Sequence, residues 1–384
     1  MSNRIEQSML QAALSKCDCG GISFSLGLPA PEALASCDLG LISEHALAFT
    51  ANSLQYQAPS RVLKESIVDL MRSRGVECFV DELVLTSGAQ QGIALVARLL
   101  LARGYSAVAE DLTYPGFRQI IDAYGSSVQA VSVNPAVGIN ASSLNTVARS
   151  NGRRAFAYVI PDGHNPLGLS MSASDRDEFV FAAKALSVPI IEDASYGCLS
   201  YDGSSLLPLR ARDREGVFYV GSFSKTVAPS LRTGWIIAPK QDVSPLEALK
   251  EAADVNTASI GQHIMHGFLT CRDFPVHIAS ISSAYKIRRD TMVRALHQYF
   301  PDDVRWQVPS TGFFIWIELP PHVDAELLLS VAVDQEGVSF MPGCAFRVGS
   351  SDAGSNGFRL SFSNCQITEI GEGIHRLGRV LGRW

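Results

Sequence analysis

Hydrophobic and polar positions alternate along the middle of this chain in blocks that predict strands and helices by turns. Short apolar runs typical of buried strands occur at residues 82–86, 107–110, 128–133, 155–160, 188–193, 217–220 and 235–238. Apolar residues recur with helical spacing at residues 67–74, 93–102, 117–124 and 175–186. Strands that alternate with helices are typical of a mainly parallel sheet covered on both faces, so we expect an α/β fold.

The pattern differs at the two ends of the chain. Helical spacing predicts a helix at residues 4–16, and an extended segment follows at 22–29. Beyond Pro239, helical spacing dominates from 246 to about 300, and the remaining elements are strands at 312–319, 338–343 and 358–362 and a helix at 368–381. We therefore expect a large domain at 46–285 and a smaller α+β domain formed by 286–384 together with an N-terminal arm, residues 1–45.

Composition narrows the class of protein. A chain of 384 residues with 47% hydrophobic and 18% charged residues suits a globular protein of two domains. A net charge of -6 argues against nucleic acid or an anionic membrane as the main partner. The eight cysteines include no Cys-x-x-Cys pair, so we expect no metal site and reduced thiols in the cytoplasm. The polar N-terminus predicts neither a signal peptide nor a membrane span.

The strongest candidate chemistry follows the apolar run at 217–220. The run ends at Gly221-Ser222, where the chain can turn sharply, and Lys225 follows Ser222 and Ser224, with Arg232 seven residues on. Burial and a nearby arginine both disfavour the ammonium form of a lysine, and a neutral lysine can form a Schiff base with a carbonyl. On this stretch alone, a surface lysine after a strand explains the residues equally well.

Other candidate groups follow other strands of the expected sheet. They are Ser87, Gly88, Ala89 and Gln90 after one strand, Tyr114 after another and Asp193 after a third. Taken singly, each has a structural explanation as a helix cap, a turn residue or a surface group. Because ligands of open α/β sheets bind beyond the carboxyl ends of the strands, the shared position of these groups predicts one binding site.

The stretch around Lys225 resembles the Schiff-base segment of fold-type I pyridoxal-phosphate (PLP) enzymes of the class I and II aminotransferase family. The pattern there is Ser-x-Ser-Lys followed by Arg-x-Gly, and it is matched by Ser222, Ser224, Lys225, Arg232 and Gly234. The resemblance implies that Lys225 holds PLP and that Arg232 grips its phosphate. It extends from Gly27 to the last helix and is nearest to 2-aminoadipate-type aminotransferases and to the aminotransferase-like domain of MocR-type regulators.

Five further positions match residues with roles in that family. Asn165, in an Asn-Pro-x-Gly turn, and Tyr196 would contact the ring hydroxyl of the cofactor, and Arg359 would clamp the substrate carboxylate. Gly27, in a Phe-x-x-Gly-x-Pro segment, would bring the N-terminal arm to the substrate. Tyr56 would reach the cofactor phosphate of the partner subunit in a homodimer. The resemblance thus implies both a substrate site and a dimer.

The candidate groups have complementary chemistry for this cofactor. Backbone N–H groups of Gly88 and Ala89 at a helix start suit a phosphate, and Ser222, Ser224 and Arg232 can add donors. The Asp193 carboxylate suits a protonated ring nitrogen, which makes the ring an electron sink. Tyr114 offers a flat face for stacking on the ring.

Two departures from the family pattern bear on the reaction. The family's glycines after Tyr56 are absent, and Leu167 stands where threonine is frequent, which suggests a reshaped substrate entrance. His164, just before Asn165, is either a substrate contact or a loop histidine. No residue of the expected side-chain pocket points to acidic, aromatic or aliphatic substrates.

We interpret the chain as a PLP-dependent aminotransferase that moves the amino group of an α-amino acid to a 2-oxo acid. Lys225 would form the Schiff base and then transfer the proton at Cα. One alternative is a PLP enzyme of the same fold that decarboxylates, eliminates, oxidises or cyclises its amino acid. Another is a non-catalytic domain that senses PLP or an amino acid, as the regulator resemblance suggests. The short segment before the expected core favours a free-standing enzyme.

Overall fold

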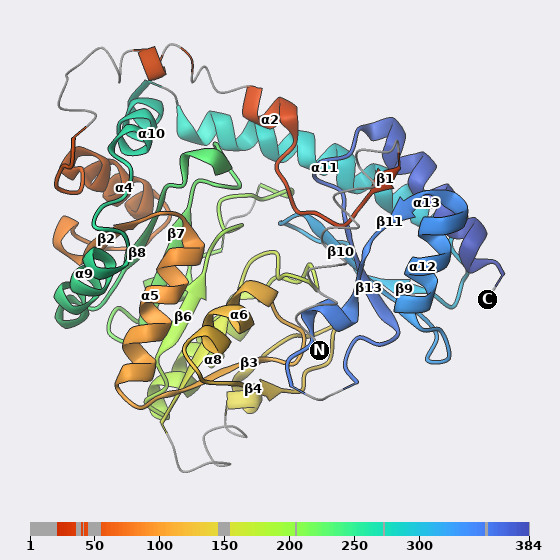
Figure 1. The fold of residues 1–384 in the computed structure, drawn as a ribbon, viewed down its shortest axis with the longest axis horizontal. Helices are drawn as coiled ribbons and strands as arrows, with labels where there is room; N and C mark the ends of the chain where they lie inside the picture. The colour runs from red at the N-terminus through yellow and green to blue at the C-terminus, as the bar shows by residue number, and fades with distance from the viewer. Residues whose placement is uncertain are drawn as a thin grey trace.

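A mixed sheet lies at the centre of the larger body of the molecule (Figure 1). The structure is a computed structural model that describes residues 21–35, 40, 42–44, 55–144, 154–203, 206–271, 273–349 and 352–383, so the helix expected at 4–16 lies outside the described residues. In this part of the chain the large sheet has seven strands in the order β2-β8-β7-β6-β5-β3-β4. They are β2 (Leu83–Thr86), β3 (Ser106–Glu110), β4 (Val128–Val131), β5 (Ala155–Val159), β6 (Ile190–Asp193), β7 (Val217–Ser222) and β8 (Gly234–Ile237).

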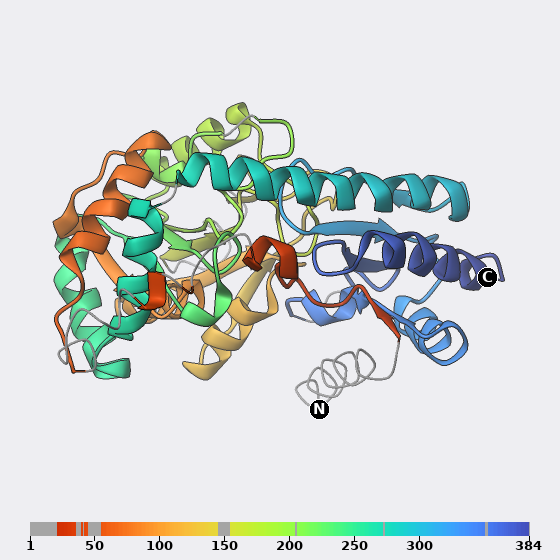
Figure 2. The same ribbon diagram turned by 90° about the horizontal axis from the view of Figure 1, so that it is seen from above.

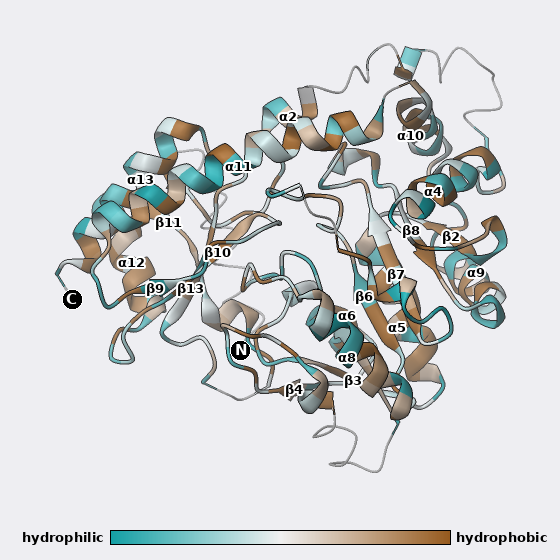
Figure 3. Cartoon of the chain, turned by 180° about the vertical axis from the view of Figure 1, so that it is seen from behind, coloured by the Kyte–Doolittle hydropathy of each residue, from teal (hydrophilic) through white to brown (hydrophobic). Residues whose placement is uncertain are grey.

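The direction of the strands confirms the expected α/β class. Strands β4, β3, β5, β6 and β7 run parallel, and β8 alone of the seven runs antiparallel to both of its neighbours, β7 and β2. All four residues of β6 and all six of β7 are buried, because helices cover both faces (Figure 3). The carboxyl ends of these strands, at Glu110, Asp193 and Ser222, therefore lie along one edge of the sheet.

The helices of the larger body form where the sequence repeats apolar residues at helical spacing. They are α4 (Arg61–Ser73), α5 (Ala89–Ala102), α6 (Pro115–Ala123), α8 (Ala173–Ala185), α9 (Lys240–Asp254) and α10 (Ser259–Cys271). On α5, Ile93, Val96 and Leu100 pack with Phe218 and Val220 of β7 in one hydrophobic core. At the start of α8 the Ser172 side chain accepts a hydrogen bond from the backbone of Asp175.

The smaller body contains a four-stranded antiparallel sheet of described residues, in the order β12-β13-β10-β9. Its elements are β9 (Arg305–Trp306), β10 (Phe314–Glu318), α12 (Ala325–Glu336), β11 (Val338–Ser339), β12 (Met341–Pro342), β13 (Gly357–Ser361) and α13 (Ile367–Leu381). The single strand expected at 338–343 is wrong in one respect, because the chain changes sheets at Phe340. Strand β12 pairs with β13, whereas β11 pairs in parallel with β1 (Ile22–Ser23), near the start of the described chain.

Two segments connect the bodies. Helix α11 (Phe274–Tyr299) runs without a break from the larger to the smaller body (Figure 2). The domain boundary predicted between residues 285 and 286 falls inside this helix, and the proposed division stays a prediction. The segment from β1 to α2 (Pro31–Ala35) crosses between the bodies as an extended chain. None of the helices in the described part of the chain has the length and hydropathy of a membrane-crossing segment.

Candidate active site

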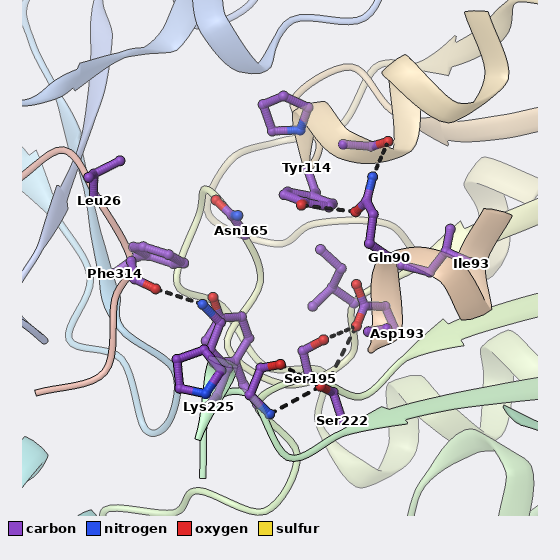
Figure 4. Close-up of a pocket in the computed structure, with 18 of the residues that line it drawn as sticks. Leu26, Gln90, Ile93, Tyr114, Asn165, Asp193, Ser195, Ser222, Lys225 and Phe314 are labelled. Atoms are coloured by element: carbon purple, nitrogen blue, oxygen red, sulfur yellow. Dashed lines mark hydrogen bonds between the residues drawn. The ribbon is translucent and has the colours of Figure 1, made fainter. Parts of the chain in front are cut away.

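The carboxyl edge of the large sheet borders a cavity of about 470 Å³ that the smaller body closes from the other side (Figure 4). The structure brings twelve of the residues predicted from sequence to its wall: Gly27, Ala89, Gln90, Tyr114, Asn165, Asp193, Tyr196, Ser222, Ser224, Lys225, Arg232 and Arg359. Ser87, Gly88 and Tyr56 do not line it. Residues from seven separate stretches of the chain thus meet in one place.

Lys225 lies just beyond the end of β7 with its amine inside the cavity. Its Nζ donates a hydrogen bond to the carbonyl oxygen of Gly27 at 2.6 Å and lies 5.9 Å from the centre of the Tyr196 ring. Burial and, to a smaller extent, the positive charge of Arg359 together lower the pKa of Lys225 to about 8, whereas Asp193 opposes the shift. A large fraction of the amine is therefore neutral, and so nucleophilic, at mildly alkaline pH.

Asp193, the last residue of β6, has a carboxylate fixed by three donors. Oδ2 accepts from the Tyr158 hydroxyl at 2.7 Å, and Oδ1 accepts from the Ser195 backbone at 3.1 Å and its hydroxyl at 2.6 Å. Burial and the Asp193 charge raise the pKa of Tyr158 well above its usual range, so its hydroxyl stays a donor. Sequence reasoning missed both partners. The Asp-x-Ser spacing is typical of an Asx-turn and could have pointed to Ser195, but nothing singled out Tyr158.

Arg359, in β13, holds its guanidinium at the opposite wall. Nη1 donates to Asn165 Oδ1 at 2.6 Å, Nη2 donates to the carbonyl oxygen of Ser25, and the group lies 4.0 Å from the centre of the Phe314 ring. The buried Nε has no hydrogen-bond partner among the described residues. Burial lowers the pKa of Arg359 to about 10, which leaves it a cation at neutral pH. A buried cation with an unused donor suits a carboxylate ligand.

A set of hydrogen-bond donors suited to a phosphate gathers at the start of α5. Ala89 and Gln90 begin this helix, where the N–H groups have no intrahelical acceptor, and Ser222, Ser224 and Arg232 line the same cavity. Arg232 Nη1 lies 3.4 Å from Ser224 Oγ. Together with the carboxylate of Asp193 and the amine of Lys225, these donors fit the phosphate, ring nitrogen and carbonyl of PLP.

Ser87 supports this turn from behind. Its backbone N–H donates to Gln91 Oε1 at 2.8 Å, its hydroxyl donates to Asp254 Oδ2 at 3.0 Å, and its carbonyl oxygen accepts from Arg232 Nη2 at 2.9 Å. Each polar group of Ser87 thus has a protein partner. The residue holds Arg232 and the start of α5 in place rather than facing the cavity.

Replacing Gly88 with Ala should weaken PLP binding by about tenfold or more. Gly88 has φ +89, and an added Cβ would lie 2.5 Å from Arg232 Nη2, so the guanidinium would have to leave its position. A hydrogen bond to a charged group contributes about 1.5–3 kcal/mol, which corresponds to the expected loss. The measurement is a titration of the cofactor-free variant with PLP, followed by absorbance.

Gly104 provides the matched control for this substitution. It also has a positive φ, +83, but an added Cβ would meet nothing within 4 Å. Both Gly→Ala variants should lose thermal stability through backbone strain of order 1–3 kcal/mol, and only Gly88→Ala should lose PLP affinity. Equal PLP affinity of the two variants would contradict a role for Gly88 and Arg232 in phosphate binding.

Tyr114 presents its ring to the cavity from the start of α6. Its hydroxyl donates to Gln90 Oε1 at 3.0 Å, and Gln90 Nε2 donates to the carbonyl oxygen of Gly116 at 3.2 Å (Figure 4). Burial raises the pKa of Tyr114, which keeps the hydroxyl protonated. The ring is thus held by a side chain from α5, in an orientation available for stacking on an aromatic ligand.

Two residues singled out from the sequence lie away from the cavity. His164 is buried against Glu110 and lines a separate hollow behind the wall. Tyr56 is 83% exposed and lies at another surface hollow, beside Asn256 and Thr257. The apolar part of the cavity wall, which sequence reasoning did not identify, consists of Leu26, Ile93, Pro115, Ile160, Pro229, Phe314, Met341 and Phe346.

The chain is similar to known proteins in both sequence and structure. The family model described as aminotransferase class I and II matches residues 42–377. Aromatic-amino-acid aminotransferase 1 of Thermococcus litoralis is 33% identical over 94% of this chain and 88% of its own. The structure of the α-aminoadipate aminotransferase of Thermus thermophilus, complexed with N-(5'-phosphopyridoxyl)-L-leucine, matches with a TM-score of 0.87 and 28% identity, over 98% of this chain and 96% of that one.

The chain is also similar to transcriptional regulators. An uncharacterized regulator of the helix-turn-helix type from Bacillus subtilis, YdfD, is 27% identical over 89% of this chain, which spans 69% of that protein. The relatives thus include both aminotransferases and regulators with an aminotransferase-like domain, the two groups that the sequence resembles.

Proposed function

This chain belongs to the class I and II aminotransferase family, and we propose that Lys225, Asp193 and Arg359 carry the reaction at the cavity that they line together. As a member of this family the protein is a PLP-dependent aminotransferase, whose substrates are amino acids and 2-oxo acids. The observation that best supports the three roles is that these groups line one cavity. They are the amine of Lys225, whose pKa is lowered, the carboxylate of Asp193, which is fixed by hydrogen bonds, and the buried guanidinium of Arg359.

The roles follow from the chemistry of each group. Bound PLP supplies an electron sink that stabilises the charge left when a bond at the substrate Cα breaks. Arg359 binds the substrate carboxylate and so fixes the position of Cα. Lys225 Nζ would anchor the cofactor, and as a free amine it would take the proton from the substrate Cα and deliver it to the carbonyl-derived carbon of the cofactor. Asp193 would hold the ring nitrogen protonated through its negative charge, and Tyr158 and Ser195 orient its carboxylate.

A homodimer and a cytoplasmic location belong to the same proposal. The exposure of the Tyr56 ring, together with its match to the family tyrosine that serves the partner subunit, supports a second copy at that surface. The free cysteines Cys78, Cys198, Cys271, Cys344 and Cys365 support a reducing compartment. Sedimentation of the purified protein would test the dimer directly.

The charges of the cavity favour neutral amino acids with large apolar side chains. The Lys and Arg side chains among the described residues that line it are Lys225, Arg232 and Arg359. The proposed roles assign them to the cofactor carbonyl, the cofactor phosphate and the α-carboxylate, which leaves no cation for a second carboxylate. Leu26, Met341 and Phe346 instead offer an apolar surface to the side chain. The name of the relative from Thermococcus litoralis, an aromatic-amino-acid aminotransferase, supports this substrate class.

We expect leucine, methionine and phenylalanine to react at least about a hundredfold more efficiently than aspartate and glutamate. A buried charge without a partner costs about 3–5 kcal/mol, which more than accounts for this ratio. The measurement adds single amino acids to the PLP-loaded protein, follows loss of the visible absorption and identifies the 2-oxo acid released. Glutamine, an uncharged isostere of glutamate, separates the effect of charge from that of size.

The possible outcomes test the substrate class and the residue roles separately. Equal efficiency with glutamate and leucine would overturn the substrate class and leave the residue roles intact. Binding of every amino acid without release of any 2-oxo acid would contradict the roles themselves. Carbon dioxide or ammonia as the product would indicate another reaction of the same cofactor.

A further inference from the structure

A buried chain of contacts links the large sheet to the turn that carries Asn165. Glu110, the last residue of β3, is 3% exposed, and its Oε1 accepts a hydrogen bond from the backbone of Ile139 at 2.6 Å. Its Oε2 contacts Nε2 of His164, which is 5% exposed. The other ring nitrogen of His164, Nδ1, accepts from the backbone N–H of Leu167 at 3.3 Å. None of these groups lines the active-site cavity.

The contacts indicate which nitrogen of a neutral imidazole carries the proton. Because Nδ1 accepts a backbone N–H, it carries no proton, so the proton of a neutral ring sits on Nε2 and faces the Glu110 carboxylate. A carboxylate that orients a histidine by its far nitrogen is a common way to fix a ring. The backbone of His164 is also fixed, since its N–H donates to Leu169 O at 2.8 Å and its carbonyl accepts from Gly168 N at 2.6 Å.

The turn held in this way is the one that places Asn165 in the active site. Asn165 lies between His164 and Leu167, the two residues that the imidazole joins, and its Oδ1 accepts from Arg359 Nη1 at 2.6 Å. A shift of this turn would move the amide that orients the carboxylate-binding arginine. It would also move the group that matches the family's contact to the cofactor ring hydroxyl.

We propose that His164, oriented by Glu110, is a positioning residue that sets the place of Asn165 against Arg359 and the cofactor ring. The inference rests on the proposed roles of Asn165 and Arg359. It assigns to His164 no contact with the substrate. One rigid link is formed by the Glu110 carboxylate, the His164 imidazole and the Leu167 backbone. Loss of either side chain should therefore displace the side chain of Asn165.

The test uses the PLP-loaded protein and three variants of the link. His164→Gln can still reach Glu110 but loses the acceptor for the Leu167 N–H, His164→Asn has the opposite pattern, and Glu110→Gln keeps an acceptor oxygen without the charge. Each should raise KM for the best amino acid by about tenfold, with a smaller change in kcat. Each should also shift the pH midpoint of the cofactor's visible absorption and weaken binding of an α-methyl amino acid, which lacks the Cα proton.

A double-mutant cycle with Asn165→Ala decides between positioning and mere structural support. If His164 acts through Asn165, adding His164→Gln to Asn165→Ala should change KM and the absorption midpoint little further. Ile139→Ala is the matched control, because it removes packing beside Glu110 but keeps the backbone donor. It should lower thermal stability without a shift of the midpoint.

The remaining outcomes overturn the inference in distinguishable ways. The positioning role alone would be contradicted if the effects of His164→Gln and Asn165→Ala were additive. It would also be contradicted if all three link variants kept the wild-type KM and absorption midpoint. Wild-type behaviour of Asn165→Ala by itself would overturn both this role and the function proposed for Asn165. A midpoint shift in Ile139→Ala equal to that in His164→Gln would show that general loosening is enough.

Discussion

Replacing Lys225 with Ala should lower turnover by at least about 10³-fold, because positioned proton transfer alone contributes roughly 10²–10⁴. Lys225 is the lysine whose amine faces the cavity within the described chain, and its pKa of about 8 supplies neutral amine near physiological pH. The measurement is release of 2-oxo acid under multiple-turnover conditions, with the amino acid that reacts best with the wild type.

Two controls show whether the loss of turnover comes from the missing amine or from failure to bind PLP. The variant should still bind PLP, since the donors around Ala89, Ser222 and Arg232 remain, but the complex should lose cofactor on gel filtration. Addition of a small primary amine should restore part of the turnover by replacing the missing base. Turnover near the wild-type value without any added amine would refute the role of Lys225.

Replacing Asp193 with Asn should lower kcat/KM by about 10³-fold. A pair of opposite unit charges about 4 Å apart contributes about 4 kcal/mol at an effective dielectric constant near 20, and each 1.36 kcal/mol is tenfold in rate. Asparagine keeps the shape of the side chain and can still accept from Tyr158 or Ser195, so the loss reports mainly the charge. The measurement is kcat/KM for the best amino acid together with the spectrum of the bound cofactor.

Tyr158→Phe is the matched control, because it removes one hydrogen bond to Asp193 and leaves the charge. Its expected loss is about tenfold at most, the value of a single hydrogen bond. An Asp193→Asn variant within tenfold of the wild type would contradict the proposed interaction with the ring nitrogen. Equal losses in both variants would assign the effect to orientation of the carboxylate rather than to its charge.

The fold class and most of the polar residues of the cavity wall could be predicted from the sequence, because both follow from local sequence patterns. Each strand of the large sheet is a short apolar run, and burial on both faces makes such runs recognisable. Parallel strands bring their carboxyl ends to one edge, so Asp193 and the Lys225 turn could be placed together without coordinates. The Ser-x-Ser-Lys and Arg-x-Gly pattern added the chemistry, and the family comparison agrees with it.

Other features depend on contacts between segments that no local pattern relates. Ser25 and Gly27 of the N-terminal segment accept hydrogen bonds from Arg359 and Lys225 through backbone oxygens, which carry no signature in the sequence. Ser87 looked like a cofactor ligand, but its polar groups are all used by Gln91, Asp254 and Arg232.

By itself the sequence determined an α/β protein of the aminotransferase family, and it predicted a reactive lysine, a phosphate-binding helix start and a carboxylate for a ring nitrogen. The tertiary structure decided what surrounds them: the apolar wall at Phe314 and Phe346, the fixing of Asp193 by Tyr158, and the position of His164 behind the site. The physical reason is the range of the forces involved. Hydrophobic periodicity depends on residues within a single helix or strand. The packing of the smaller body against the sheet edge instead brings together residues that are hundreds of positions apart in the sequence.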